Sequence, residues 1–573
     1  MTIIRRRTLL GGSIGGVAAT TLASRWARTD ASPPPAQPAL ATSGAGTTLE
    51  QVARPVTTKG YTRLTAGKGY PVTVRTELSA AGAKRSTTRT GRASIVQFTD
   101  LHVIDAQSPV RFEWLHTATS SAFRPQEALG THGAAQLVRR VNQLRTGPFS
   151  GRAFDCVVTT GDSSDNHEKV ELDWFLTVMS GGKITPNTGA RGHWEGVQNT
   201  KDKLYYLPES STHDTYKKAG FPTVPRFFKH ATATHTSAGL DTPWYSVFGN
   251  HDDSISGMLP SDGPVLADLY TGGVKFTGFE NASGNAALRR AVVGKPTVIP
   301  PNSKLPKTHW KVTADDRRSP FTPREFMAAH LDPAFDGPGP HGHGFTLDAL
   351  SQGIGYYTFP IAPGIIGIAM DSTNRAGFVQ GSIGDAQFRW IERTLQASSS
   401  RYYDNRGAEH RQHVSDQLFI VFSHHTSDSM ANLAQAPDLL ETRHSGAEVV
   451  NMLQRYPNVL AWANGHTHRN RIRPHRHDDP TRSFWEINTA SHIDYPQHAR
   501  IIDVCDNADG TLSLFTTLIE SAAPYRAAYD DGSPEALASL YRELSYNDLH
   551  RNDKRLGTYG DRNAELLLRH PTA

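Results

Sequence analysis

Five short motifs rich in aspartate, asparagine and histidine follow one another along the chain. They are Asp100-Leu101-His102, Gly161-Asp162-Ser163-Ser164-Asp165-Asn166, Gly249-Asn250-His251-Asp252, Ser423-His424-His425 and Gly465-His466-Thr467-His468. Their side chains supply oxygen and imidazole nitrogen, the donor atoms that transition metals bind. Charged groups avoid protein interiors unless they are paired or metal-bound, yet each motif ends or follows an apolar run, so core packing does not explain them. Together they indicate a hydrolytic site with two metal ions.

The spacing within the motifs supports this interpretation. Asp100 and His102 are two residues apart, so an extended backbone places both side chains on one side, and His466 and His468 repeat the spacing. Asp162 follows a strand and a glycine, where a carboxylate can bridge two ions. With Asp100 and Asp162 as the only charged ligands, two divalent ions would keep a charge of about +2. Such a positively charged site favours phosphate as its ligand.

Apolar runs predict six buried strands, and five of them lead directly into a motif. The runs are 95–98, 156–158, 244–248, 365–370, 418–422 and 459–463. Helical spacing of apolar residues predicts helices over 134–145 and around 388–395, and a capping box at Ser445 starts a third. The runs 485–489, 500–504 and 512–518 are expected to form a second sheet. Ligands then lie at the carboxyl ends of strands, as is usual in α/β proteins.

The motifs must converge on one site, which favours a single catalytic domain within the 573 residues. We expect a leader and linker at 1–46, an N-terminal extension at 47–92 and the catalytic domain at 93–520. Segments of about 167–243 and 253–364 are interpreted as insertions around the site mouth. Residues 521–573 are expected to form a polar helical tail. Cys156 and Cys505, the only cysteines, are predicted to be buried free thiols.

The first residues resemble an export signal. Arg6-Arg7-Thr8-Leu9-Leu10 is a twin-arginine pattern, followed by a Gly/Ala-rich stretch too short and too weakly apolar for a membrane span. We therefore expect the twin-arginine export machinery as a partner, no stable membrane anchor, and a secreted, periplasmic or cell-wall location. Leader arginines account for most of the net charge of +5, so nucleic acid is not expected as a partner.

In these motifs the chain resembles the calcineurin-like metallophosphoesterase superfamily, whose pattern is Asp-x-His, Gly-Asp-x-x-Asp, Gly-Asn-His-Asp/Glu, a histidine after an apolar strand, and Gly-His-x-His. The resemblance covers about residues 93–500 and is nearest to exported members with long insertions between motifs. It implies an α/β fold, a four-layer α/β/β/α sandwich of two mixed sheets. It also implies two divalent or mixed-valence transition metal ions, with manganese, iron and zinc all suitable.

The resemblance also assigns roles to the motif residues. It implies that one metal is held by Asp100, His102 and His468, the other by Asn250, His424 and His466, and that Asp162 bridges them. His424 is preferred over His425 because it is the first histidine after the strand. Asp165 is expected to support the ligands rather than bind metal.

A water acidified by the two ions would attack phosphorus, with His251 as the general acid and Asp252 orienting its ring. Three further residues are weaker candidates. His492 could contact phosphate, although a plain turn is as good an explanation, and Arg375 could clamp an anion, although a solvated loop residue explains it better. Asn166 is expected to support the turn at Asp162.

The function favoured by these observations is hydrolysis of a small phosphomonoester. The alternative is a phosphodiesterase acting on nucleotides, cyclic nucleotides or phospholipid headgroups, which the sequence does not separate from the first. A non-catalytic surface module that binds through its insertions is a further possibility, but it would be expected to have lost a ligand or His251. Aminopeptidases with two metals have sites richer in carboxylates than this histidine-dominated set.

Overall fold

The structure is a computed structural model that describes residues 43–82, 85–260, 264–292, 310–435 and 440–571. These belong to one compact unit, Pro38–Ala573. The predicted export signal lies outside the described residues. Within them, no helix combines the length and apolar character that a bilayer crossing requires.

One sheet has seven strands and carries the first three motifs. Its order is β3-β25-β24-β23-β4-β5-β8. β4, β5 and β8 run parallel to one another, as do β25 and β3, whereas β23 and β24 are antiparallel to their neighbours. The strands are β3 (Thr73–Arg75), β4 (Thr90–Phe98), β5 (Cys156–Thr160), β8 (Trp244–Val247), β23 (Ala499–Asp506), β24 (Thr511–Ile519) and β25 (Ala564–Arg569).

The other large sheet has six strands in the order β13-β14-β18-β20-β22-β21. Its centre, from β14 to β22, is parallel, and β13 and β21 are antiparallel edge strands. The strands are β13 (Tyr357–Ala362), β14 (Ile365–Ala369), β18 (Leu418–Phe422), β20 (Val459–Asn464), β21 (Arg471–His475) and β22 (Phe484–Asn488).

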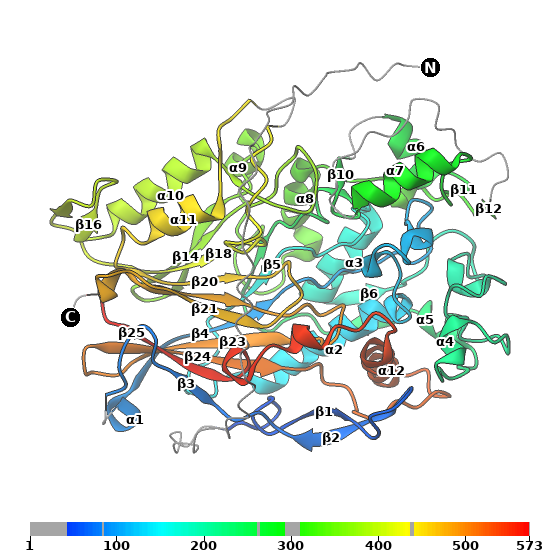
Figure 1. Cartoon of the computed structure of the whole chain (residues 1–573), viewed down its shortest axis with the longest axis horizontal. Helices are drawn as coiled ribbons and strands as arrows, with labels where there is room; N and C mark the ends of the chain where they lie inside the picture. Colours follow the sequence, from blue (N-terminus) through cyan, green and yellow to red (C-terminus); the bar gives the residue numbers. More distant parts are fainter. Residues whose placement is uncertain (1–42, 83–84, 261–263, 293–309, 436–439, 572–573) are drawn as a thin grey trace, which may run out of the picture. The chain divides into compact units, whose positions relative to one another are not determined.

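Successive side chains of a strand point alternately into two different cores, one toward the other sheet and one toward the helices. The two sheets therefore lie between layers of helices (Figure 1). In β18, Ile420 and Phe422 belong to the core shared with the seven-stranded sheet, while Phe419 and Val421 pack with α10 (Asp385–Ala397) and α11 (Gly446–Leu453). Such alternation is the consequence of the two-residue period of a strand. Helices α2 (Gly130–Leu144) and α3 (Lys169–Ser180) contribute to the shared core. The expected four-layer α/β/β/α sandwich of two mixed sheets is therefore confirmed.

Two sequence-based expectations differ from the structure. The strand expected at 485–489 is β22, which pairs with β20, whereas β23 and β24 extend the sheet of β4, so the three do not form a separate sheet. The C-terminal segment is not a polar helical tail. Its helix α12 (Pro534–Asn547) is largely buried, with Tyr541 against Gly133 of α2, and the segment ends in β25 inside the large sheet.

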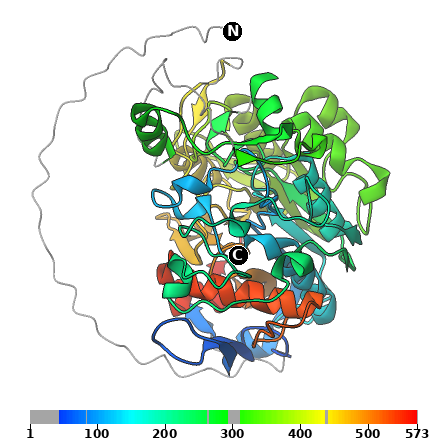
Figure 2. The same cartoon turned by 90° about the vertical axis from the view of Figure 1, so that its right-hand side faces the viewer.

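The N-terminal extension is likewise built into the unit. Its strands β1 (Gln51–Pro55) and β2 (Leu64–Lys68) form a hairpin, and β3 lies at the edge of the seven-stranded sheet. Figure 2 shows α12, in red, next to this dark-blue hairpin. Tyr61 donates to Glu543 of α12 over 2.9 Å, and the Arg63 guanidinium lies 3.1 Å from the same carboxylate.

The insertions contain short elements rather than featureless loops. The remaining short strands are β6 (Gly182–Ile184), β7 (His235–Ser237), β9 (Ser254–Ile255), β10 (Leu259–Pro260), β11 (Val274–Lys275), β12 (Trp310–Lys311), β15 (Ile383–Gly384), β16 (Arg401–Tyr403), β17 (Glu409–Arg411) and β19 (Arg443–His444). The remaining α-helices are α1 (Arg85–Thr88), α4 (Thr215–Lys218), α5 (Phe227–Ala231), α6 (Pro264–Thr271), α7 (Ala282–Val292), α8 (Pro323–His330) and α9 (Leu347–Gln352). The predicted helix start at Ser445 is confirmed as a capping box with Glu448, and both cysteines are buried and free.

Candidate metal centre

Each of the five motifs begins within three residues of the end of a strand. β4, β5 and β8 lead to Asp100, Asp162 and Asn250, and β18 and β20 lead to His424 and His466. The first three strands are parallel neighbours in one sheet, and the last two are parallel neighbours in the other. Because the carboxyl ends of parallel neighbours lie at one edge, the two sheets bring the motifs together.

The backbone at most of the predicted ligands is left-handed. The φ angles are 49° at Asp100, 43° at His102, 52° at Asp162, 68° at His466 and 53° at His468. Residues with a Cβ enter this region at a cost of roughly 1–3 kcal/mol each. Such strain persists only where the surroundings enforce it, and it is found most often at functional sites. Left-handed residues also occur outside the motifs, as at Arg145 and Ala508, but five of the seven predicted ligands have this conformation.

Two motif glycines are required by close approach. A Cβ on Gly249 would overlap the backbone nitrogen and the carboxylate of Asp162, and a Cβ on Gly465 would overlap Thr99 and the carboxylate of Asp100. Each glycine thus lets one motif touch the ligand of another motif.

The predicted ligands form two groups of three. In the first, the Asp100 Oδ1 and His468 Nε2 atoms are 3.2 Å apart, and the His102 and His468 Nε2 atoms are 3.3 Å apart. In the second, Asn250 Oδ1 lies 2.9 Å from His424 Nε2 and 3.1 Å from His466 Nδ1. The donor atoms of each group thus face one another across the width of a single ion.

Asp162 lies between the two groups. Its Oδ2 atom is 3.5 Å from His102 Nε2 and 3.2 Å from His424 Nε2, and its Oδ1 atom accepts the His251 backbone N–H over 2.8 Å. One carboxylate oxygen is therefore shared by both groups, which is the position of a bridging ligand.

This donor set fits two transition metal ions. Histidine and carboxylate ligand atoms within 4.8 Å of one another occur in overlapping groups that include Asp100, His102 and His468, and Asp100, Asp162 and His424. Burial would raise the pKa of Asp100, but the neighbouring His468 and His424 outweigh it and lower the pKa to about 2. The carboxylate is therefore ionised, as a metal ligand must be.

Buried carboxylates that pair with arginines also contact two of the predicted histidine ligands, at the ring nitrogen Nδ1. Asp165 accepts from His102 Nδ1 over 2.8 Å and pairs with Arg111, and Arg124 lies 3.6 Å away. Asp494 lies 2.6 Å from His468 Nδ1 and pairs with Arg124. A carboxylate on the far nitrogen of a ligating histidine fixes its tautomer and ring orientation.

No motif or spacing in the sequence assigns a role to Asp494, Arg111 or Arg124, or to Arg555, which lies 2.7 Å from Asp494. Asp494 stands near the candidate His492, but Arg124 and Asp494 are 370 positions apart. Spacing along the chain carries no signal for such a pair.

His425 lies beside His466 but has both ring nitrogens occupied. Nδ1 is 2.9 Å from the Ser372 hydroxyl and Nε2 is 3.1 Å from the Val379 carbonyl oxygen. His424 instead directs Nε2 at Asn250 and Asp162, while its Nδ1 is 2.8 Å from the Thr160 carbonyl oxygen. The geometry therefore favours His424 as the ligand.

His251 stands at the edge of the cluster with 13 % of its side chain exposed. Its Nδ1 donates to the Asp165 backbone carbonyl over 2.8 Å, and its Nε2, beside Gly257, makes no hydrogen bond to any residue that the structure describes. The expectation that Asp252 orients this ring does not match the structure. The Asp252 carboxylate accepts from the backbone of Ser163, Ser164 and Gly249 and so fixes the motif backbones instead, because the turn at Gly249 directs it toward them.

The weaker candidates have other positions. His492 is buried, with its ring beside Tyr541 of α12, and burial lowers its pKa to about 4, so it is a core residue and not a phosphate contact. Asn166, in the turn after Asp162, donates to Glu171 over 2.6 Å. Arg375 is exposed and lines a cavity that none of the seven predicted ligands lines.

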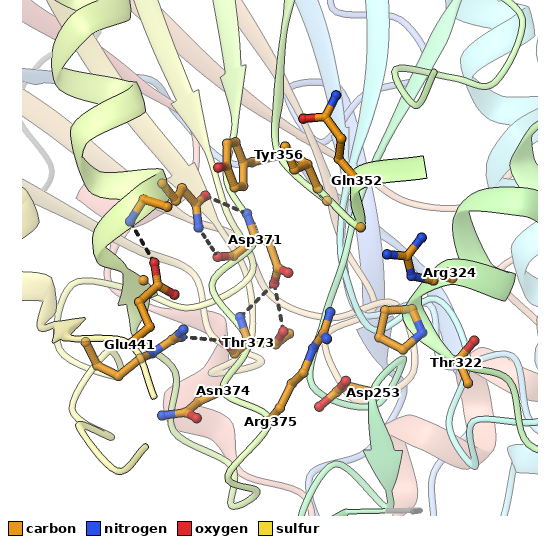
Figure 3. A pocket seen from close by; sticks show the side chains of 18 of the residues that line it. Asp253, Thr322, Arg324, Gln352, Tyr356, Asp371, Thr373, Asn374, Arg375 and Glu441 are labelled. Atoms are coloured by element: carbon orange, nitrogen blue, oxygen red, sulfur yellow. Dashed lines mark hydrogen bonds between the residues drawn. The ribbon is translucent and has the colours of Figure 1, made fainter. Parts of the chain in front are cut away.

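Two cavities large enough to hold a ligand lie near the centre, and a third, beside His251 and Asp165, measures only about 10 Å³. The larger, about 730 Å³, is lined by Arg375 together with Asp253, Arg324, Asp371 and Glu441, and Figure 3 shows Asp371 and Arg375 facing into it. The smaller, about 350 Å³, is lined by the predicted ligand His466 and by several arginines.

The fold and this site define a layered α/β protein with a buried His/Asp cluster suited to two metal ions. No protein-family model matches the sequence, and no curated protein matches it. Among solved structures, the chain is similar to the crystal structure of a dimetal phosphatase from Danio rerio, at 11 % identity and a TM-score of 0.35. The similarity covers 75 % of this chain and 99 % of that one.

Proposed function

We propose that this protein is an exported phosphomonoesterase with a dinuclear metal centre, acting on a small phosphorylated substrate. The observation that carries the proposal is the position of Asp162, whose Oδ2 atom lies within 3.5 Å of a histidine nitrogen from each ligand group. A carboxylate shared between two groups of donors is the arrangement that holds two ions at the roughly 3.5–4 Å separation found in phosphatases and nucleases.

In this proposal Asp100, His102 and His468 would hold one ion, Asn250, His424 and His466 would hold the other, and Asp162 would contribute to both. When bound, such ions lower the pKa of water and neutralise charge on the phosphoryl oxygens. The ligand cluster itself carries few negative charges, which suits an anionic substrate better than a peptide.

His251 acts as the general acid. A carbonyl oxygen only accepts hydrogen bonds, so His251 Nδ1 stays protonated and donates to the Asp165 carbonyl. In the imidazolium form, the proton that can be transferred is therefore the one on Nε2. Nε2 gives this proton to the leaving oxygen, and the ring remains in the tautomer that Asp165 holds. Transfers of this kind contribute about 10²–10⁴-fold to rate.

The test is metal analysis of the purified full chain followed by kinetics on p-nitrophenyl phosphate and bis(p-nitrophenyl) phosphate. We expect two equivalents of manganese, iron or zinc, hydrolysis of both esters only in the loaded protein, and a higher kcat/KM for the monoester. Hydrolysis of the diester alone would overturn the choice of monoesters. A loaded protein that hydrolyses neither ester would favour a binding module.

A further inference from the structure

A cavity of about 350 Å³ opens directly beside the metal ligand His466, and we call it the His466 cavity. Its charged lining consists of Arg469, Arg471, Arg473, Asp428 and Glu486. Because a predicted ligand forms part of the wall, a molecule bound at the metal centre can extend into this space.

The three arginines follow one another at every second position. Arg471 and Arg473 belong to β21, the edge strand of the six-stranded sheet, and the two-residue period of a strand places them on one side. One carboxylate serves both, since Asp428 lies 3.0 Å from Arg471 and 2.8 Å from Arg473. These two arginines and Asp428 together retain one positive charge.

The second carboxylate of the His466 cavity is already satisfied. Glu486 accepts from the Ser427 backbone and hydroxyl over 2.8 and 2.7 Å. It also lies 2.9 Å from the Asn464 amide nitrogen and 2.8 Å from His475 Nε2. Its oxygens are therefore turned toward these partners and do not pair with an arginine of the cavity.

Arg469 is the one arginine of the His466 cavity that neither of the cavity's two carboxylates pairs with. Among the residues that the structure describes, it makes no ion pair and no hydrogen bond, and its Nε–H is buried without an acceptor. Burying an unsatisfied donor costs about 1–3 kcal/mol, so we expect a hydrogen-bond acceptor to bind beside this group. A guanidinium offers a planar fork of donors that matches phosphate and carboxylate oxygens.

We propose that the His466 cavity binds a second anionic group of the substrate, a phosphoryl or carboxylate, through Arg469. The inference rests on the proposed function and deepens it. The substrate is then a small molecule with two anionic groups, one at the metal ions and the other on the Arg469 fork. Gln380, which also lines the cavity, offers an amide donor for the same group.

Binding of inert phosphonates to the metal-loaded full chain tests this without turnover. The probes are methylphosphonate, with one anionic group, ethane-1,2-diphosphonate and propane-1,3-diphosphonate, with two, and 3-phosphonopropionate, which replaces one phosphoryl by a carboxylate. Calorimetry should show at least one two-headed probe binding about 10–100-fold tighter than methylphosphonate, the range expected for a hydrogen-bonded charge pair. Comparison of the phosphoryl and carboxylate probes identifies the preferred second group.

The variant Arg469→Gln should abolish this gain and leave methylphosphonate binding within about twofold. The matched control is Arg389→Gln, which removes the same charge from an arginine that is 67 % exposed on α10. It should leave every probe unchanged, and thermal melting checks that both variants are folded.

Two failures are distinguishable. If the loaded wild type hydrolyses phosphomonoesters but binds all probes equally, or if Arg469→Gln weakens methylphosphonate as much as the two-headed probes, the second-anion site is wrong and the proposed function stands. If the loaded wild type hydrolyses no phosphoester, the proposed function is wrong.

Discussion

At the scale of single residues, the proposed general acid His251 allows metal binding to be tested separately from catalysis. Its ring is held by the Asp165 carbonyl, and its backbone N–H is held by Asp162, so truncating the ring removes no predicted ligand. We expect His251→Ala to keep its two metal equivalents and to lose about 10²–10⁴-fold in kcat. The checks are metal analysis and steady-state kinetics on p-nitrophenyl phosphate.

The control for this prediction is His410→Ala, because His410 is 45 % exposed and pairs with Asp404, and neither residue is a predicted ligand. Its kcat should equal that of the wild type. Unchanged turnover in His251→Ala with full metal content would refute the acid role.

We expect Asp494 to influence metal affinity through His468. Its carboxylate lies 2.6 Å from His468 Nδ1, and it also pairs with Arg124 and Arg555. Substitution of such supporting groups typically costs 10–100-fold in metal affinity. We expect Asp494→Asn to show a loss of this size in chelator competition, and a lower melting temperature, because Arg555 loses its charged partner and Arg124 keeps only Asp165.

Asp404→Asn is the matched control, since it removes the same charge from an exposed turn. If Asp494→Asn lowers the melting temperature but leaves metal affinity as in the wild type, Asp494 has only a structural role.

At the scale of elements, the sequence predicts well the strands that are buried on both faces. β18 and β20 are continuous apolar runs because helices and the second sheet cover them, and such runs are visible in a sequence. β21 carries two arginines and a proline because it is an edge strand, and no periodicity distinguishes it from a loop.

The same contrast applies to the site. The motif ligands are found from the sequence because each follows its strand within a few residues. Asp494 is missed because its partners Arg124 and His468 come from other segments, and only folding brings them together. The role of Asp252 was predicted wrongly for a related reason, since adjacency to His251 says nothing about which backbone amides a carboxylate faces.

The protonation of buried histidines is another property that the sequence alone does not predict. His330, at the end of α8, is buried among Phe326, Trp244 and Phe345, and burial lowers its pKa to about 3. The folded state therefore excludes a proton that the unfolded chain takes up near its ordinary pKa of about 6.5. Stability from this group is complete above pH 6.5 and falls as the pH drops toward 3, by up to about 1.4 kcal/mol per pH unit.

We expect His330→Phe to flatten the pH dependence of the unfolding free energy between pH 5 and 6.5, measured by urea denaturation. His341→Gln, at a histidine that is 49 % exposed, should leave the slope unchanged. An equal slope in His330→Phe and the wild type would show that His330 is not neutral in the folded state or that it stays protected in the unfolded one.

At the scale of the whole molecule, the last strand is part of the core. β25 pairs with β24 on one side and β3 on the other, and Leu566, Leu567 and Leu568 are buried. Each buried leucine contributes about 2–5 kcal/mol, against a total stability of 5–15 kcal/mol for a typical domain. We expect a chain ending at Arg562 to be insoluble or unfolded by circular dichroism, and one ending at Arg569 to fold. A folded, active chain without β25 would contradict this.

Assembly of the site depends on the folded molecule, which bears on export. The ligands extend from Asp100 to His468 and meet only once both sheets have formed, so the centre cannot take up its metals before folding. The twin-arginine pattern at Arg6-Arg7 fits this order, because that machinery carries folded proteins.

We expect replacement of both Arg6 and Arg7 by lysine to leave folded, metal-loaded protein in the cytoplasm, measured by fractionation and by phosphatase activity in each fraction. The matched control replaces Arg25 and Arg28 by lysine, which keeps the leader's charge and should leave export intact. Equal export of the two variants would show that the arginine pair is not the signal.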